Sequence, residues 1–146
     1  MIHNMFDQGA GRRKLPAYAF DHDVVDTLDT IQKRVLWLST NMIHHANTMR
    51  PNPDTTKVGG HQASSASMVT IMTALFFHYL QYGDRISVKP HASPVYHAIQ
   101  YLLGKLPLEY LTEFRSYHGL QAYPSRTKDV DTVSYTHLTL PTIYSV

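Results

Sequence analysis

Residues 57–64 read Lys57-Val58-Gly59-Gly60-His61-Gln62-Ala63-Ser64 and lead directly into a long apolar segment. The two glycines lack a Cβ, so the backbone can turn tightly there and approach a ligand closely. Ser64 or Ser65 is expected to cap the N-terminus of the helix that follows. Because the first turn of a helix has free N–H groups and a partial positive charge, this turn is suited to an anion or a polar ligand.

A second loop repeats this arrangement later in the chain. A short strand is predicted over Arg85-Ile86-Ser87-Val88, followed by Lys89-Pro90-His91-Ala92-Ser93-Pro94 and another helix. Ser93 is suited to the N-cap of that helix and Pro94 to its first position. Since each loop brings one histidine to the start of a helix, we expect His61 and His91 to share one site.

The composition narrows the class of protein. With 146 residues, 43% of them hydrophobic and 16% charged, the chain has the size and balance of one globular domain. No apolar run reaches the roughly 18 residues of a membrane-spanning helix, and no signal-peptide pattern is present. A formal net charge of +2 is too small to indicate nucleic acid, and the absence of cysteine excludes disulfides and thiolate metal sites. We therefore expect a cytoplasmic protein that binds neither nucleic acid nor a membrane.

The helical part of the chain begins near Asp23, the expected N-cap. Trp37 lies beside the apolar stripe of this helix and is expected to pack against a neighbour, and Arg50-Pro51 should end the helix. Residues 1–22 have no such period and are predicted to form a poorly ordered leader. The apolar residues of this stripe are three or four positions apart, as in an amphipathic helix, and are Val24, Leu28, Ile31, Val35, Leu38 and Met42.

Three more helices are predicted. Residues 65–82 carry apolar groups around most of the circumference, which predicts burial on several sides. The next helix runs from Ser93 to Gly104 with His97 on its surface, and the last runs from Pro107 to about Gly119. The fold class expected is α/β, mostly helical as given. Because one strand cannot form a sheet, the domain is expected to be incomplete.

The last residues differ in character from the rest. Residues 133–142 read Val-Ser-Tyr-Thr-His-Leu-Thr-Leu-Pro-Thr and resemble one translated frame of the transposase adapter used in sequencing libraries. We therefore expect residues 133–146 to be a non-native tail, and the partial domain to cover residues 23–132.

The two histidine loops resemble segments of the transketolase-like, thiamine-diphosphate-dependent enzymes, above all the homodimeric decarboxylating component of pyruvate dehydrogenase. Residues 57–68 are similar to a Gly-Gly-His-x-Ala-Ser segment that begins a helix in that family. Residues 84–94 are similar to a strand followed by Gly-His-x-Ser-Pro, and residues 109–124 to a stretch from Phe-Arg to Gly-Leu-x-x-Tyr-Pro. The three motifs occur in the same order with matching gaps over residues 26–129.

The resemblance implies the N-terminal part of a diphosphate-binding domain and a set of site residues. It implies catalytic roles for His61, His91 and Tyr123, and cofactor contacts from Gly60, His61, Ser64, His91 and Ser93. Histidine suits these roles because its imidazole exchanges protons near neutral pH. The sequence departs from the family at Lys89-Pro90, where Gln-Gly or Asn-Gly is common, so amide roles cannot be carried over.

The implied cofactors are thiamine diphosphate and Mg²⁺, but this chain lacks the family's Gly-Asp-Gly…Asn segment, so no metal ligands are expected in it. The pyrimidine-binding domain is absent too, and the chain is expected to be inactive alone. The parent protein would decarboxylate a 2-oxo acid as a homodimer, with an acyltransferase component of a multienzyme complex as a partner. The alternative activity is two-carbon ketol transfer from a ketose.

Two readings of another class remain. A small stand-alone helical binding module would use a polar pocket at His61 and His91. A metal-binding protein is suggested by the count of ten histidines, but the chain has no His-Glu-x-x-His or comparable spacing.

Overall fold

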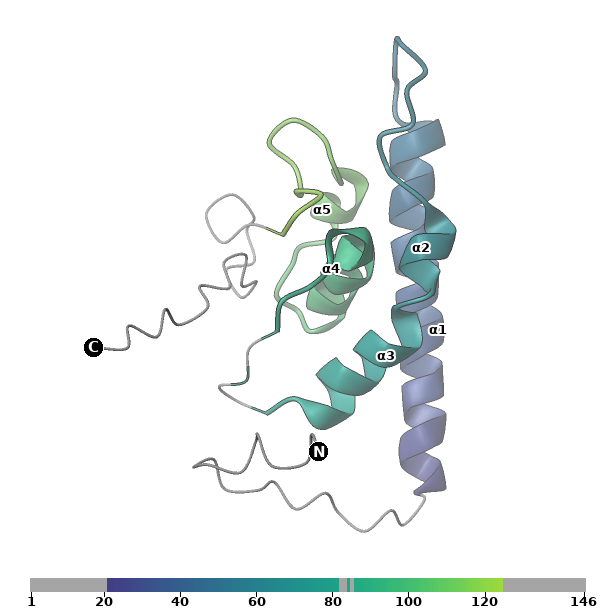
Figure 1. Ribbon diagram of the computed structural model, residues 1–146, viewed down its shortest axis with the longest axis vertical. Helices are drawn as coiled ribbons and strands as arrows, with labels where there is room; N and C mark the ends of the chain where they lie inside the picture. The colour runs from purple at the N-terminus through teal and green to yellow at the C-terminus, as the bar shows by residue number, and fades with distance from the viewer. Residues whose placement is uncertain (1–20, 82–83, 85, 125–146) are drawn as a thin grey trace, which may run out of the picture.

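The computed structural model describes residues 21–81, 84 and 86–124, and the regular secondary structure of these residues is helical. Helix α1 (His22–His44) is the longest element and continues directly into a π-helix, η1 (His45–Met49). The other helices are, in chain order, α2 (Gln62–Ala66), α3 (Val69–Ala74), η2 (Leu75–Tyr79), η3 (Pro90–Ala92), α4 (Ser93–Leu102) and α5 (Glu109–Thr112). In Figure 1, α1 stands as a column, α2 lies along it, α3 slants away from it, and α4 and α5 lie on the same side of α1.

Helix α1 begins earlier than the sequence pattern predicted. The Asp21 carboxylate accepts hydrogen bonds from the backbone N–H groups of Asp23 (3.1 Å) and Val24 (3.3 Å), so Asp21 rather than Asp23 is the N-cap. His22, assigned to the predicted leader, is already helical. Residues 1–20 of that leader and the predicted tail, residues 133–146, lie outside the described residues. The predicted end is confirmed, because Arg50 leaves the helical conformation.

The second predicted helix is shorter and broken. It begins at Gln62, so its N-cap is His61, whose side chain makes no capping hydrogen bond. The expected cap at Ser64 or Ser65 is therefore wrong. A turn at residues 67–68 separates α2 from α3, and η2 ends at Tyr79.

The burial of α3 is one-sided. Val69, Met72 and Thr73 are buried where α3 packs against α1 and α4, whereas Ile71 on the opposite side is 56% exposed. The prediction of burial on several sides is therefore wrong, because the described residues supply neighbours on one side only.

Helix α4 is the most deeply buried element, with residues 93–100 all buried. Ser93 is its first residue, and Ala92 takes the N-cap position instead. His97 is fully buried rather than on the surface as predicted. Its ring packs against the rings of Tyr96 (centroids 5.5 Å apart) and Phe114 (6.0 Å), because the loop after α5 covers this side of α4.

The last predicted helix is cut short after Thr112. Arg115 and His118 have positive φ angles of 57° and 60°, which a continuing right-handed helix cannot contain. The predicted stop at Gly104 is confirmed, since α4 ends at Leu102 and Gly104 follows with a φ of +70°.

The predicted strand is not present in its described part. Residues 86–88 form neither a strand nor a helix, and no strand occurs in residues 21–81, 84 or 86–124. A strand needs a neighbouring strand for its hydrogen bonds, and the described residues offer none. The mostly helical character is thus confirmed, while the α/β class stays a prediction.

Two apolar clusters hold the helices together, and α1 contributes to both. One joins α1 to α3 and α4 through Val35, Met72 and Ile99, and the other joins the end of α1 to Leu111 and Phe114. Trp37 belongs to neither cluster and is 62% exposed, so its predicted packing is wrong for the described part of the chain. None of the described helices is long and apolar enough to span a membrane.

Candidate functional site

The Gly59-Gly60 turn is pressed against the end of α1. A Cβ added to Gly59 would lie 2.6 Å from the carbonyl oxygen of Ile43, closer than real Cβ atoms come to backbone. Gly60 has a φ of +87°, which side-chain-bearing residues rarely adopt. Gly59 is therefore required because the turn lies so close to α1, and Gly60 is required because of its positive φ angle.

The side chain of Asn47, in η1, fixes this turn. Its Oδ1 accepts a hydrogen bond from the Gly59 N–H (2.6 Å), and its Nδ2 donates one to the Gly60 carbonyl (3.0 Å). Asn47 thereby replaces the backbone partners that the turn residues lack. Asn47 is not among the residues predicted from the sequence, because its partners are 12 and 13 residues away in the chain.

The loop before the turn is stabilised by its own polar groups. The Asp54 carboxylate accepts a hydrogen bond from the Thr56 N–H (3.0 Å), and this bond lowers the pKa of Asp54 below its ordinary value. The Asn52 side chain donates to the Thr56 carbonyl. These contacts define the path by which the chain returns from α1 to the glycines.

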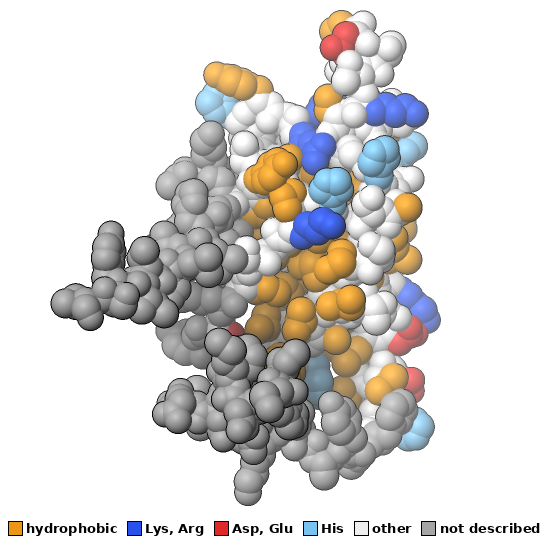
Figure 2. All heavy atoms as spheres, in the orientation of Figure 1, with side chains coloured by type: hydrophobic (Ala, Val, Ile, Leu, Met, Phe, Trp, Pro, Cys, Tyr) orange, Lys and Arg blue, Asp and Glu red, His pale blue; other side chains and the backbone are white. Residues whose placement is uncertain are grey.

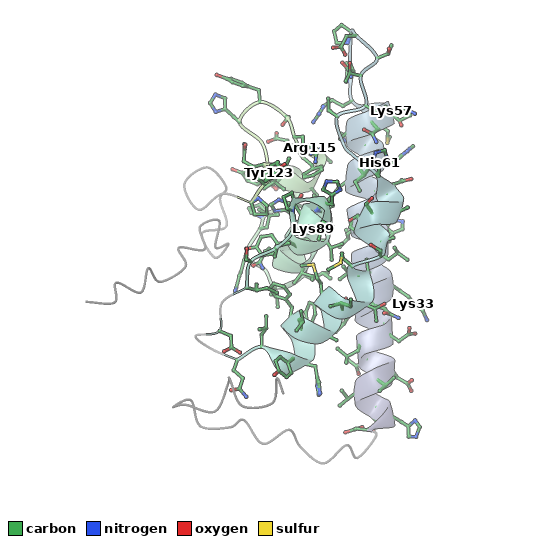
Figure 3. The ribbon with its side chains drawn as sticks, in the orientation of Figure 1. Lys33, Lys57, His61, Lys89, Arg115 and Tyr123 are labelled. Atoms are coloured by element: carbon green, nitrogen blue, oxygen red, sulfur yellow. The ribbon has the colours of Figure 1, made fainter. Side chains whose placement is uncertain are left out.

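A pocket of about 210 Å³ lies where the two predicted loops meet. Its lining includes four predicted site residues, so the structure brings His61 and His91 to one cavity; both are exposed to solvent. Figure 3 shows His61 beside α1, with Arg115 across from it and Lys89 below. The lining residues are Ile43, Gly59, Gly60, His61, Ser64, Pro90, His91, Pro94 and Arg115.

Two predicted site residues do not line this pocket. The side chain of Tyr123 is 67% exposed and lies outside the lining. Ser93 is fully buried, and its hydroxyl has no hydrogen-bond partner among the described residues. Their predicted roles stay predictions, and any contact that they make with a ligand would extend beyond the cavity itself.

Arg115 is a lining residue that sequence analysis missed. Its Nη1 donates a 2.7 Å hydrogen bond to the carbonyl of Val58, directly before the glycines. A Cβ added to Gly60 would lie 3.6 Å from the same Nη1, so the guanidinium packs against the turn. The only sequence signal was its place in the Phe-Arg motif, and no periodicity pointed to a pocket.

The charge of the pocket is positive. Arg115 carries a permanent charge, and none of the described lining residues is a carboxylate. Lys89 directly precedes the lining residue Pro90, and Figure 2 shows lysine or arginine side chains beside histidines on this face. The pocket is therefore suited to an anion. The expected help from a helix dipole is small, because α2 has only five residues.

Metal ligands are not gathered in the described part of the chain. No group of three His, Asp or Glu side chains in residues 21–81, 84 and 86–124 could hold an ion together. The expectation that Mg²⁺ ligands lie in another part of the protein stays a prediction.

The comparisons with known proteins point to one kind of enzyme. The chain is 33% identical over 101 aligned positions, 62% of its length, to the "Pyruvate dehydrogenase E1 component" of Mycolicibacterium smegmatis. It is likewise 33% identical over 101 positions to that of Mycobacterium tuberculosis, and 32% identical over 103 positions, 64% of its length, to that of Pseudomonas aeruginosa. No family model and no solved structure matches the chain.

The chain is thus related to the pyruvate dehydrogenase E1 components, which confirms the resemblance found in the three motifs. It spans only about a tenth of the length of these relatives, covering 10% of the two mycobacterial proteins and 11% of the Pseudomonas protein.

Proposed function

We propose that this chain is part of a thiamine-diphosphate-dependent enzyme that decarboxylates a 2-oxo acid, as pyruvate dehydrogenase does. The observation that carries the proposal is the pocket in which His61 and His91, from two separate loops, lie with a glycine turn and an arginine. The relatives named above favour this activity over ketol transfer, because they are named for pyruvate dehydrogenase.

The residues of the pocket fit part of the cofactor. The volume of about 210 Å³ is below the about 300 to 1,000 Å³ of most complete small-molecule sites. A positively charged cavity of this size suits the diphosphate of the cofactor or the carboxylate of a 2-oxo acid. Since Gly60 has no side chain, the backbone here can approach such a ligand closely. Other parts of the protein would complete the site.

Six of the lining residues have roles that their positions allow. Thiamine diphosphate, when bound, supplies the carbon nucleophile and the electron sink that decarboxylation needs. His61 and His91 would hold or deliver protons at their ring nitrogens, since imidazole exchanges protons near neutral pH. Ser64 would donate its hydroxyl hydrogen to an anionic oxygen. Ile43, Pro90 and Pro94 give the cavity an apolar side that limits the access of water.

The remaining parts of the proposal concern the whole protein. Tyr123 and Ser93 would act on portions of the ligand that extend beyond the cavity. Mg²⁺ would be held by residues outside the described chain, in a cytoplasmic homodimer that delivers its acyl product to an acyltransferase component. The 146-residue chain alone would be inactive.

The test uses the complete protein encoded at the source locus, amplified without a transposase library. We expect release of CO₂ from pyruvate that requires thiamine diphosphate and Mg²⁺. Ketol transfer from a ketose to an aldehyde, without pyruvate decarboxylation, would support the alternative activity instead. A complete protein that neither binds thiamine diphosphate nor turns over either substrate contradicts the proposed function.

A further inference from the structure

The guanidinium of Arg115 is held from two directions. Its Nη1 donates to the Val58 carbonyl (2.7 Å), and its Cζ lies 5.3 Å from the centroid of the Phe114 ring, within cation–π range. The side chain therefore bridges the loop after α5 and the segment before the Gly59-Gly60 turn. These two contacts place the charge on one wall of the pocket.

The backbone of Arg115 is fixed as well. The Arg50 side chain donates from Nη1 to the Phe114 carbonyl (2.9 Å) and from Nη2 to the Arg115 carbonyl (3.3 Å). The Arg115 N–H donates to the Leu120 carbonyl (2.8 Å). These bonds hold Arg115 at a φ of 57°, a left-handed conformation that costs an L-residue about 1 to 2 kcal/mol. An arginine in a costly conformation, held by several bonds, is a candidate for a functional position.

Among the described residues, the charge of Arg115 has no carboxylate partner. Arg115 forms no ion pair with a described residue, and its Nε is buried without a hydrogen-bond acceptor in that part of the chain. The carbonyl of Val58 satisfies only one N–H of a group that has five to donate. A charged donor in this state is best satisfied by an anionic ligand.

We infer that Arg115 is the fixed anion-binding group of this pocket: it would bind an oxyanion beside His61 and His91 whatever the protonation state of the imidazoles. The inference rests on the proposed function and adds to it a residue that selects anionic ligands. The ligand oxyanion has two sources, the diphosphate of a cofactor or the carboxylate of a 2-oxo acid. Arginine suits both, because its planar fork can donate two parallel hydrogen bonds.

The experiment titrates the ¹⁵N-labelled 146-residue chain with inorganic pyrophosphate and, separately, with pyruvate. We expect a saturable shift of the Arg115 side-chain Nε–H signal with at least one of them, and no shift for Arg34, an exposed arginine of α1. If pyrophosphate binds more tightly, Arg115 binds the diphosphate of the cofactor. If pyruvate binds more tightly, Arg115 binds the carboxylate of the substrate.

Substitutions give the second readout. Arg115→Gln should weaken binding of that anion about ten- to a hundredfold, the loss expected for one charged hydrogen-bonding group. Arg115→Lys keeps the charge but lacks the planar guanidinium. Its affinity for the anion should lie between that of the wild type and that of Arg115→Gln. Arg34→Gln removes the same formal charge outside the pocket and should change affinity less than about twofold, since exposed charges are screened.

Three results would overturn the inference: affinity of Arg115→Gln within twofold of the wild type, an Nε–H signal of Arg115 that ignores a bound anion, or no binding of either anion. If Arg115→Gln does not fold, the inference is tested by the anion affinity of Arg115→Lys and by the Nε–H signal of Arg115 in the wild type. The proposed function has a separate test in pyruvate turnover. If the complete protein turns over pyruvate but anion binding does not depend on Arg115, only the inference is contradicted. If anion binding depends on Arg115 but the complete protein does not turn over pyruvate, only the proposed function is contradicted.

Discussion

The carboxamide of Asn47 binds the backbone of Gly59: its Oδ1 accepts the Gly59 N–H over 2.6 Å, and its Nδ2 donates to the next carbonyl, that of Gly60, over 3.0 Å. The π-helical turn η1 carries this side chain, so the last turn of the long helix is joined to the turn that presents His61. A change at Asn47 therefore acts on the pocket through the backbone, without touching a lining side chain.

Asn47→Ala should lower the free energy of unfolding by about 1 to 3 kcal/mol, because the buried Gly59 N–H loses its acceptor. Urea unfolding followed by circular dichroism measures this change. The matched control is Asn41→Ala, at an exposed position of α1 just before η1, which should change stability by less than about 0.5 kcal/mol. Equal effects at the two asparagines would show that the Asn47 bonds do not stabilise the turn.

Three glycine-to-alanine variants separate steric need from backbone conformation. Gly59→Ala should cost most, more than about 2 kcal/mol, because its Cβ would meet the Ile43 carbonyl oxygen at 2.6 Å. Gly60→Ala and Gly104→Ala have positive φ angles but no contact closer than 3.6 Å, so each should cost only about 1 to 2 kcal/mol. Thermal unfolding of the three variants gives the order, and a Gly59→Ala variant as stable as Gly104→Ala contradicts it.

If the complete protein has the proposed activity, His61→Ala and His91→Ala should each lower kcat by about 10²- to 10⁴-fold, the range of positioned acid–base groups. Steady-state turnover of pyruvate measures this loss. His78→Ala is the control, because His78 is also exposed but does not line the pocket. Loss of less than about threefold at His61 would remove it from the mechanism.

The sequence predicted the loops of the site better than their surroundings. The pocket is lined by four of the predicted residues, Gly60, His61, Ser64 and His91. They could be predicted because Gly-Gly-His and Pro-His-Ala-Ser-Pro are local patterns typical of turns. Arg115 and Asn47 were missed because their partners lie 57 and 12 or 13 residues away. Local sequence patterns do not indicate contacts between residues so far apart in the chain.

The positions of two helices were predicted well, and helix burial was predicted less well. Periodicity located α1 and α4, but the exposure of Trp37 and the burial of His97 depend on which element packs on which face. His97 is covered by the loop after α5, near Phe114, and no pattern within α4 indicates that loop. The break between α2 and α3 was missed for the same reason, since the apolar pattern continues through it.

Trp37 is the only tryptophan, so its exposure can be measured directly. At 62% exposed, its fluorescence should be quenched by acrylamide nearly as strongly as that of a free tryptophan derivative. N-acetyltryptophanamide provides the reference, and the chain unfolded in urea provides the upper limit. A quenching constant several-fold below that limit would mean that Trp37 packs against a neighbour, as its place beside the apolar stripe had suggested.

Gln100 tests the cost of a buried polar group in α4. Its side chain is fully buried, and neither its oxygen nor its nitrogen has a hydrogen-bond partner in the described part of the chain. Gln100→Met keeps the length and removes the unsatisfied amide, so stability should be unchanged or higher by about 1 to 2 kcal/mol. Gln32→Met is the matched control, because the Gln32 amide donates to Asp29 (2.7 Å) and accepts from Thr70 (3.0 Å). That change should lower stability by about 0.5 to 1.5 kcal/mol in the same urea titration. If Gln100→Met is the more destabilising of the two, the amide of Gln100 has partners in the native protein and α4 is held partly by polar contacts.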